Sequence, residues 1–380
     1  MLKRTALLGA ATVLAITTGA LATPALASGP DRDGHRATQR ALDAAVREGV
    51  PGATAQVRGN GRTWKGTSGV GNLTTHKPRG AHDHYRVGSV TKTFVSTVLL
   101  QLEAEGELDL DDTVEHWLPG LVTGDGYDAD RITLRHLLNH TSGIADYLED
   151  ARFNEAYMTK NFLDHRNDTF APEELVRIGV RNKARFDPGG GWDYSNTNYA
   201  LAAMVIEKAT GHAYGDEIEH RIIEPLGLRA TKVPGTDPRM PRPASRAYSK
   251  LGDSAGPTYD VTEFNPSGSF GSGEMISDSA DLNRFYTALV RGELLPPEQM
   301  KEMRTTAPGG TQGPDSAYGL GLQRWKLECG TVVWGHGGGI HGSSSLVLTT
   351  PDGSHSLALN FNGDWAGDMT KVAEAEFCGK

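Results

Sequence analysis

Ser89 and Lys92 have the residue types and the spacing of a nucleophile and its base. They open a helix-like run in which apolar residues recur three and four apart, namely Val90, Phe94, Val95, Val98, Leu99 and Leu102. On a helix, this spacing puts the lysine ammonium one turn from the serine hydroxyl, close enough to bond it or to take its proton. A free serine hydroxyl is a weak nucleophile, and a lysine whose pKa is lowered by burial and by adjacent cations can activate it. The helix N-terminus would add free N–H groups where an oxyanion forms. By themselves, however, these residues also fit an N-cap serine followed by a surface lysine.

Tyr194 and Asn196 form a second group of candidate side chains. They follow the Pro-Gly run at 188–191 and precede a helical pattern at 200–210, which ends before Gly211. We therefore expect both residues on an irregular turn between rigid elements, where functional side chains often lie. The alternative is structural: Tyr194 packs against its neighbours and Asn196 caps the helix.

A glycine-rich stretch at 335–342 forms the third group. It contains His336 and three consecutive glycines that end at Gly339. Glycine at this density inside a strand marks a place where something approaches the backbone closely. An edge strand beside Ser89 could pair with an extended substrate and donate an N–H to an oxyanion hole. A glycine-rich bend with a surface histidine is the alternative.

Length and charge restrict the class of protein. The 380 residues carry a formal charge of −9. Residues 1–27 predict a secretory signal, because Lys3 and Arg4 precede an apolar run and the small residues up to Ala27 form a cleavage site. The acidic balance argues against nucleic acid and against anionic membrane surfaces as partners. No later segment approaches the ~18 consecutive apolar residues of a membrane span. We expect a secreted monomer that is cleaved after Ala27 and has no membrane anchor.

The chain contains two cysteines, Cys329 and Cys378. In an exported chain they suggest one disulfide, which would stabilise the fold by roughly 4 kcal/mol on the chain-entropy view. Two free thiols are the alternative. Without a third cysteine or a paired Cys-x-x-Cys, we expect no metal cluster. The histidine pairs 136/140 and 336/341 are disfavoured as metal sites, and the first pair, which has no third ligand nearby, is better explained by structural hydrogen bonds.

The elements that must position these groups are helices and strands in a mixed order. Strands at 53–57 and 63–69 flank the hairpin signal Asn60-Gly61, and the Ser89 helix ends at Gly106. Helical patterns lie at 35–48, 109–118, 134–139, 172–182, 200–210, 276–291 (with Ser277 or Ser279 as N-cap) and 369–377, and later strands at 319–325, 331–335, 343–349 and 356–360. Residues 234–268 read as a surface connection. We predict an α/β fold in which about 28–88 and 270–380 form one α/β lobe and about 89–269 a helical lobe.

Taken together and in order, the three motifs resemble those of a known family. Ser89-Val90-Thr91-Lys92, Tyr194-Ser195-Asn196 and His336-Gly337-Gly338 are similar to the Ser-x-x-Lys, Tyr-x-Asn and Lys/His-x-Gly motifs of the penicillin-recognising serine hydrolases. The tyrosine of the second motif points to the branch of class C β-lactamases and exported DD-carboxypeptidase/transpeptidases. The flanking segments at 86–92, 101–110, 137–143, 194–199 and 318–322 and the cysteine pair resemble that branch as well. The likeness covers essentially the whole mature chain.

The resemblance implies a fold and a set of roles. It implies an antiparallel sheet flanked by helices plus an all-helical lobe, with the site between them and with no metal or cofactor. Ser89 would be acylated, and Lys92 and Tyr194 would share general-base and general-acid duty. His336 would support the Tyr194 proton network. The substrate amide and the oxyanion would be held by Asn196 and by the backbone at Ser89, Gly338 and Gly339.

One part of the pattern departs from the DD-carboxypeptidase relative. There, an arginine and two hydroxyl residues bind the terminal carboxylate of the substrate, at positions that here hold Gln323, Gly337 and Gly339. Losing a charge-assisted hydrogen bond costs ~1.5–3 kcal/mol, or roughly ten- to hundredfold in affinity. The neighbouring Arg324 is the candidate replacement.

We interpret the chain as a secreted acyl-serine hydrolase resembling D-alanyl-D-alanine carboxypeptidase. Its substrates would be peptidoglycan-type D-Ala peptides or other small acyl compounds, with β-lactams as covalent ligands. Because the His-Gly-Gly form is also similar to esterases and D-aminopeptidases or amidases of the superfamily, these are the first alternative. A β-lactamase is another. A non-catalytic penicillin-binding sensor is the alternative from a different class, and the presence of all expected catalytic side chains argues against it.

Overall fold

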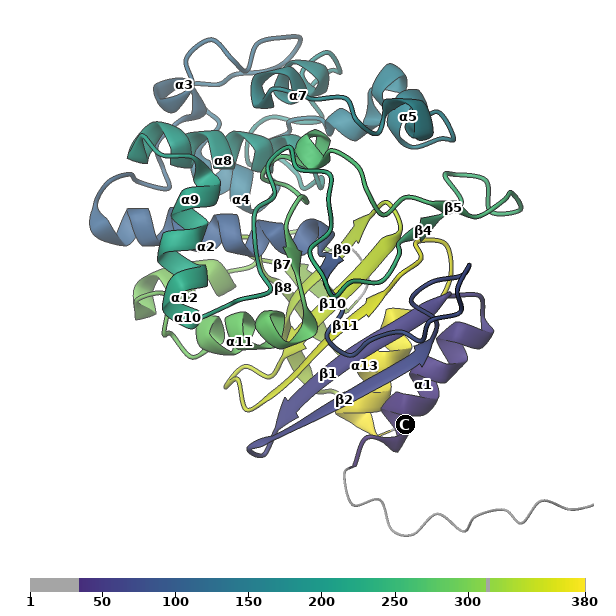
Figure 1. Ribbon diagram of the computed structural model, residues 1–380. Coiled ribbons are helices and arrows are strands. Elements are labelled where there is room, and N and C mark those ends of the chain that lie inside the picture. The colour runs from purple at the N-terminus through teal and green to yellow at the C-terminus, as the bar shows by residue number, and fades with distance from the viewer. Residues whose placement is uncertain (1–33, 312–314, 380) are drawn as a thin grey trace, which may run out of the picture. The chain divides into compact units, whose positions relative to one another are not determined.

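Seven strands of the described chain pair into one antiparallel sheet in the computed structural model, which describes residues 34–311 and 315–379 (Figure 1). Their order is β2-β1-β11-β10-β9-β8-β7. Asn60 and Gly61 join the first hairpin with φ of 51° and 71°, as a type I′ turn requires. The strands are β1 (Gly52–Gly59), β2 (Arg62–Gly69), β7 (Ser316–Tyr318), β8 (Gln323–Lys326), β9 (Val332–Ile340), β10 (Ser343–Thr349) and β11 (His355–Phe361). The predicted union of the first and last strands in one antiparallel sheet is confirmed.

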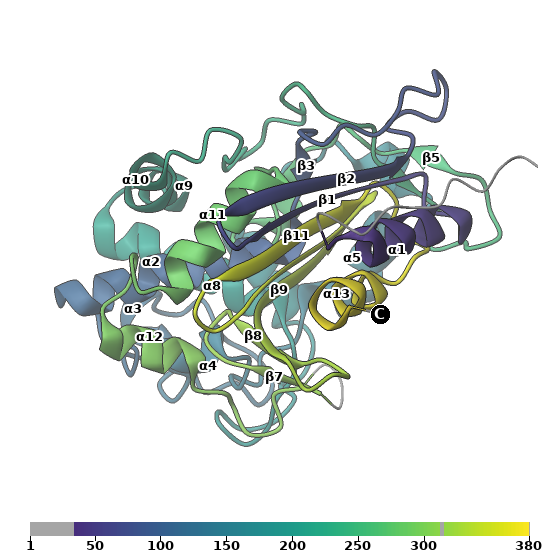
Figure 2. The same cartoon turned by 90° about the horizontal axis from the view of Figure 1, so that it is seen from below.

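Helices cover both faces of this sheet. Figure 2 shows α1 (Arg36–Arg47) and α13 (Met369–Cys378) on one side and α11 (Ser279–Val290) on the other. Alternate strand residues such as Val57 and Leu359 face the first pair of helices and form one hydrophobic core with them. The predicted disulfide is present, since Cys329 and Cys378 are bonded with their Cα atoms 5.7 Å apart. It ties the β8–β9 turn to the end of α13.

The helix that follows Ser89 is enclosed by the larger core. This helix, α2 (Thr91–Glu105), buries its predicted apolar stripe, and its other faces are buried as well. Phe94 stacks on Phe285 of α11 at a ring separation of 3.7 Å. On another face, Ser96 hydrogen-bonds the hydroxyl of Tyr199, which belongs to α8. Because α2 is surrounded in this way, its lysine is removed from water.

The other helices lie between and after these elements. They are α3 (Val114–Trp117), α4 (Leu134–Leu138), α5 (Ala151–Tyr157), α6 (Phe162–His165), α7 (Pro172–Gly179), α8 (Asn196–Thr210), α9 (Tyr214–Ile218), α10 (Glu224–Leu226) and α12 (Pro297–Arg304). Short turns of 3-10 helix are η1 (Gly88–Val90), η2 (Tyr147–Glu149) and η4 (Pro266–Ser269), and η3 (Glu219–Ile223) is a π-helix. The segment at 234–268 is a connection that also holds the short pair β4 (Tyr248–Ser249) and β5 (Tyr259–Asp260).

Several predicted elements were wrong in their bounds, and two of these differences change how the segments are paired. The helix predicted at 276–291 begins at Ser279 and is capped by Asp278, because Ile276 and Ser277 form strand β6, which pairs with β3 (Tyr85–Arg86). The strand predicted at 319–325 is interrupted, because Gly321 adopts a φ of 66° and the N–H of Gly319 bonds the carbonyl of Leu322. A hairpin turn therefore separates β7 from β8.

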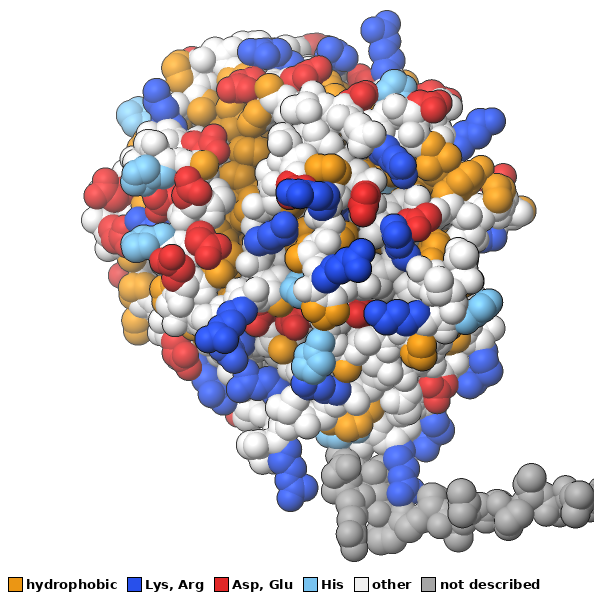
Figure 3. All heavy atoms as spheres, in the orientation of Figure 1, with side chains coloured by type: hydrophobic (Ala, Val, Ile, Leu, Met, Phe, Trp, Pro, Cys, Tyr) orange, Lys and Arg blue, Asp and Glu red, His pale blue; other side chains and the backbone are white. Residues whose placement is uncertain are grey.

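The expected secretory signal at 1–27 lies outside the described residues. From residue 35 onward the chain forms one compact unit, so the division into two lobes stays a prediction. None of the helices within 34–311 and 315–379 combines the length and the apolar character that crossing a bilayer requires. On the face drawn in Figure 3, Lys and Arg side chains are interspersed with Asp and Glu side chains.

Candidate active site

Ser89 lies in the tight turn η1, directly before α2. Its predecessor Gly88 has a φ of 56°, and a Cβ there would lie 2.7 Å from the backbone nitrogen of Gly339. Only glycine allows this contact, because a side chain would both strain the backbone and collide with the strand. Thr91 fixes the turn further by donating to the Gly88 carbonyl over 2.8 Å. The turn therefore presses Ser89 against the glycine-rich part of β9.

Lys92 reaches Ser89 as the spacing predicted. Its Nζ lies 3.0 Å from the Ser89 Oγ, 2.7 Å from the Asn196 Oδ1 and 2.8 Å from the carbonyl oxygen of Ser272. The side chain is fully buried, and this burial lowers the pKa of Lys92 to about 7, against the opposing charge of Asp146. The expected depression of the pKa is thus present, with burial rather than adjacent cations as its main cause. At neutral pH the amine is available as a base.

The three partners of Lys92 also aim its lone pair. The carbonyl oxygens of Asn196 and Ser272 accept hydrogen bonds only, so a neutral amine directs its two N–H groups at them. Its remaining lone pair then faces the hydroxyl of Ser89. Asp146 fixes this arrangement, because its Oδ2 accepts from the Nδ2 of Asn196 over 2.7 Å and so holds the amide oxygen toward Lys92. The Asp146 side chain is itself buried and bonded to the N–H of Leu148.

Tyr194 completes the group around the nucleophile. Its ring centroid is 4.9 Å from the Nζ of Lys92, and its hydroxyl hydrogen-bonds Ser89. Burial raises the pKa of Tyr194 well above its ordinary value, and the bond to Ser89 only partly opposes this. The phenol therefore keeps its proton at neutral pH and can donate it. Tyr194 lies on an irregular turn as predicted, whereas Asn196 is the first residue of α8, which begins four residues earlier than expected.

His336 lies on β9 and hydrogen-bonds Tyr318, and its support of the Tyr194 proton network stays a prediction. Its Nε2 is 2.9 Å from the hydroxyl of Tyr318, and its Nδ1 bonds the Gly337 carbonyl. Burial lowers the pKa of His336 to about 3, so the ring is neutral with its proton on Nδ1 and accepts from Tyr318. The rings of Tyr194 and Tyr318 meet edge to face at 5.9 Å. Tyr318 therefore contacts both His336 and Tyr194.

The glycines of β9 bring the strand backbone against the nucleophile. A Cβ at Gly338 would lie 2.0 Å from the carbonyl oxygen of Val87 and 3.1 Å from the nitrogen of Ser89. The pairing of β8 with β9 ends at Gly335, so the strand edge beyond it is open. This is the arrangement expected for an edge strand that donates the N–H of Gly339 to an oxyanion beside the N–H of Ser89.

Gln323 and Arg324 lie at the start of β8. The Oε1 of Gln323 accepts from the Gly337 N–H over 3.4 Å, so this buried amide covers the near end of the open edge of β9. Arg324 is paired with Trp334, two residues before His336. Successive strand residues point to opposite faces, so Arg324 does not repeat the placement of Gln323.

Sequence reasoning missed three residues that complete the site. Asp146 carries no local pattern of its own, Tyr318 lies in the flanking segment 318–322 but was given no role, and Ser272 contributes only its backbone carbonyl. A signal existed for Asp146 alone, because a buried Asn–Lys pair requires an acceptor for the amide N–H groups. His140, predicted to make structural hydrogen bonds, is fully buried and accepts from the N–H of Ser195.

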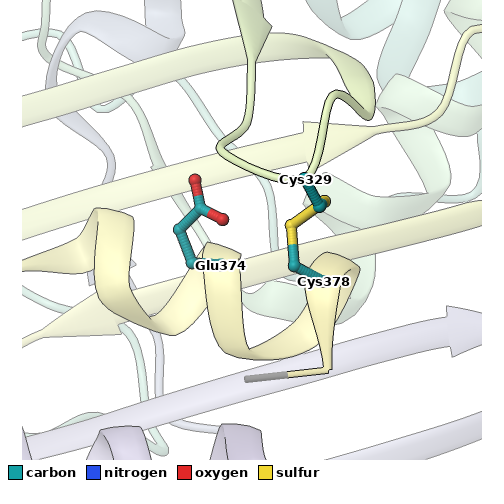
Figure 4. A group of neighbouring side chains, drawn as sticks. All are labelled: Cys329, Glu374 and Cys378. Atoms are coloured by element: carbon teal, nitrogen blue, oxygen red, sulfur yellow. A yellow bond between two sulfur atoms is a disulfide. The ribbon is translucent and has the colours of Figure 1, made fainter.

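One cluster of the described residues has the composition of a metal site. Figure 4 shows Glu374 beside Cys329 and Cys378. The two sulfur atoms are bonded to each other, so neither is a thiolate ligand. The Glu374 carboxylate accepts from the N–H of Glu328. This cluster is therefore a structural disulfide with a neighbouring carboxylate, and not a thiolate metal site.

The comparison with known proteins agrees with this geometry. The sequence model of the family described as Beta-lactamase matches residues 36–377. The chain belongs to the beta-lactamase family. Members of this family are serine hydrolases, so the predicted superfamily and fold are confirmed, while the roles of individual side chains stay predictions.

Three similar proteins illustrate the range of the beta-lactamase family. Penicillin-binding protein 4* of Bacillus subtilis (strain 168) is 31% identical over 304 residues, which are 76% of this chain and 63% of that protein. A D-stereospecific amidohydrolase from Streptomyces sp. is 57% identical, with a TM-score of 0.87 and coverage of 92% of this chain and 100% of its own. D-amino acid amidase from Ochrobactrum anthropi SV3, in complex with L-phenylalanine amide, is 30% identical, with a TM-score of 0.78. The match covers 90% of this chain and 98% of the amidase chain. The chain spans only 63% and 59% of the length of the first two curated relatives it matches.

Proposed function

We propose that this chain is a D-stereospecific amidohydrolase that acylates Ser89 with the carbonyl group of D-amino acid amides and related small amides or esters. The observation that carries the proposal is the open edge of β9, where Gln323, Gly337 and Gly339 replace the carboxylate-binding arginine and hydroxyls of the carboxypeptidase pattern. A terminal amide needs no such cationic clamp. The 57% identity to a D-stereospecific amidohydrolase over nearly the whole described chain supports the same substrate class.

In the proposed reaction, each of these side chains carries out one step of amide hydrolysis. The neutral amine of Lys92 takes the Ser89 proton as Oγ attacks the carbonyl carbon, and the N–H groups of Ser89 and Gly339 receive the oxyanion. Each such donor is typically worth ~2.7–4 kcal/mol. Tyr194 keeps its proton and lies against both Ser89 and Lys92, so it passes a proton to the leaving nitrogen and is replenished from Lys92. Water then attacks the acyl-serine, and the proton transfers run in reverse.

The carboxypeptidase activity that the sequence placed first is the second candidate. The similarity to penicillin-binding protein 4* favours it, and Arg324 would then have to bind the terminal carboxylate. β-Lactams would be covalent ligands of the same serine. Esterase activity follows from the same acyl-serine chemistry, and rapid β-lactam turnover would define a β-lactamase.

A set of substrates separates these candidates. The purified protein is incubated with D- and L-phenylalanine amide, diacetyl-L-Lys-D-Ala-D-Ala, p-nitrophenyl acetate and nitrocefin, with Ser89→Ala as the control. We expect ammonia from the D-amide, at least tenfold less from the L-amide, and a Ser89 adduct by mass spectrometry. Release of D-Ala from the tripeptide without D-amide hydrolysis would move the function to carboxypeptidase. Full activity in Ser89→Ala would show that Ser89 is not the nucleophile.

Export is part of the same proposal. The charged start, apolar run and small residues up to Ala27 support a signal that is removed. Expression of the full chain in an actinobacterial or other secreting host should place the protein in the medium with Ser28 as its first residue. Mass spectrometry of the secreted protein checks this, and an intact N-terminus in the medium would contradict it.

A further inference from the structure

A pocket opens beside the predicted oxyanion hole, where β9 ends. It has a volume of ≈ 590 Å³ and is lined by Gly339 together with the apolar side chains Leu148, Met158, Leu251, Ile340 and Trp365. In Figure 3, hydrophobic side chains reach the surface at the upper right, over the α5 and β4–β5 part of Figure 1. Pockets of this size with mainly apolar walls are typical of small-molecule sites.

The charged groups at the rim of this pocket already have partners. The Nζ of Lys250 donates to the Ser254 carbonyl over 2.7 Å, and the Oδ2 of Asp364 accepts from the Gly342 N–H over 2.8 Å. The apolar side chains that line the pocket remain partly exposed to solvent. Met158 retains 41% of its surface exposed, and Leu73 at 38% is the other large exposed hydrophobic residue among those the structure describes. The free surface of the pocket is therefore mainly apolar.

The pocket is continuous with the reaction site through one residue. Gly339 contacts the turn that holds Ser89 and also lines the pocket. A Cβ at Gly339 would have no atom within 4 Å, so its free side faces open space, whereas the free side of Gly338 is filled by Val87. A substrate whose carbonyl oxygen reaches the Gly339 N–H must place its adjoining group on the open side.

Only one part of the substrate is large enough for this space. The leaving group of a primary amide is a single nitrogen, and the end of the β9 edge at Gly337 is covered by Gln323. The opposite end, at Ile340 and His341, leads into the pocket. The group that extends in this direction is the acyl part of the substrate.

We infer that this pocket binds the side chain of the acyl residue and selects large apolar side chains, aromatic or branched aliphatic, on the D-amino acid substrate. The inference rests on the proposed function for the substrate class. The pocket would make the hydrolase prefer D-phenylalanine amide over D-alanine amide, although both lose the same ammonia.

Two substitutions each place a large ring at a residue that lines the pocket. Met158→Trp and Ser254→Trp both lie at exposed positions, so the larger ring can be accommodated without disturbing the core. Leu73→Trp is the matched control, because Leu73 is an equally exposed hydrophobic residue that does not line the pocket. The measurement is the ratio of kcat/KM for D-phenylalanine amide to that for D-alanine amide, with circular dichroism as the check on folding and a p-nitrophenyl acetate burst to count intact sites.

We expect the ratio to exceed ten in the unmodified protein and to fall at least tenfold in Met158→Trp and Ser254→Trp, while Leu73→Trp keeps it within twofold. Ratios within twofold of the unmodified protein in both folded variants would overturn the inference. If neither amide is hydrolysed but p-nitrophenyl acetate acylates Ser89, the proposed function fails instead. The same ratio, measured with p-nitrophenyl phenylacetate and acetate, then decides whether the pocket binds the acyl group.

Discussion

Replacing Asp146 by asparagine should shift the pH dependence of acylation without removing the hydrogen bond to Asn196. The Asp146 carboxylate lies one amide group away from Lys92, through two bonds of 2.7 Å each, so the charges are about 7 Å apart. At an effective dielectric constant of about 20, one unit charge at that distance contributes ~2 kcal/mol, equivalent to ~1.5 pH units. In Asp146→Asn the single amide oxygen of the introduced side chain can still accept from the Asn196 Nδ2, while the hydrogen bond from the Leu148 N–H is lost.

The sign of the shift follows from which form of Lys92 reacts. Asp146 favours the protonated amine and so raises its pKa, against the burial that lowers it to about 7. Without that charge the amine loses its proton more easily, and the acid limb of kcat/KM should move to lower pH, by up to about 1.5 units. The assay is the rate of acylation by p-nitrophenyl acetate between pH 4 and 9, measured in a stopped-flow burst.

The matched control is Asp150→Asn. Asp150 caps α5 through its Oδ1, as Asp146 caps η2, but it has no bond to the Lys92 group. We expect no shift in this variant. An acid limb that stays in place or moves to higher pH in Asp146→Asn would refute the electrostatic coupling. Asp146→Ala extends the test: the amide of Asn196 is then free to turn, and we expect acylation to slow ten- to hundredfold at all pH values, as the loss of a buried charged hydrogen bond of ~1.5–3 kcal/mol implies.

Three further predictions concern Tyr194, His336 and the disulfide. Tyr194→Phe keeps the ring contacts but removes the proton donor, so kcat should fall at least ~100-fold with little change in melting temperature; wild-type turnover would exclude the proton role. The pKa of His336 is about 3 in the folded protein, below its ordinary value of 6.5. Between pH 6.5 and pH 3 the unfolded chain therefore binds a proton that the folded protein does not bind. The free energy of unfolding should fall by ~1.4 kcal/mol for each pH unit of acidification in this range. His336→Gln should flatten urea-unfolding stability against pH by that amount, and an unchanged slope would contradict a buried neutral ring. The double variant Cys329→Ser/Cys378→Ser should lose up to ~4 kcal/mol of stability in urea and keep its acylation rate at 25 °C, since the disulfide joins α13 to the sheet far along the chain from Ser89; equal stability of the variant would show that the bond contributes nothing.

Local pattern was sufficient for much of the fold. Asn60-Gly61 specified its hairpin because both residues tolerate positive φ, and Gly106 and Gly211 ended their helices for the same reason. The strand bounds failed at Gly321, where a turn depends on a contact between the Gly321 N–H and the carbonyl of Leu138, far away in the sequence. The helix bound failed at Ile276, which pairs with a strand some 190 residues earlier. Pairing partners at such separations leave no trace in a local window.

The amino-acid sequence alone predicted the chemistry class, because the motifs at Ser89, Tyr194 and His336 occur together in one order and the spacing of Ser89 and Lys92 puts both side chains on one turn of helix. The tertiary structure decided what the sequence could not: the enclosure of α2 that lowers the pKa of Lys92, the chain from Asp146 through Asn196 that aims its amine, and the contact of His336 with Tyr318. It also placed the apolar pocket next to Gly339. These features arise where segments distant in sequence meet, and burial, dielectric environment and side-chain direction are set only by that meeting.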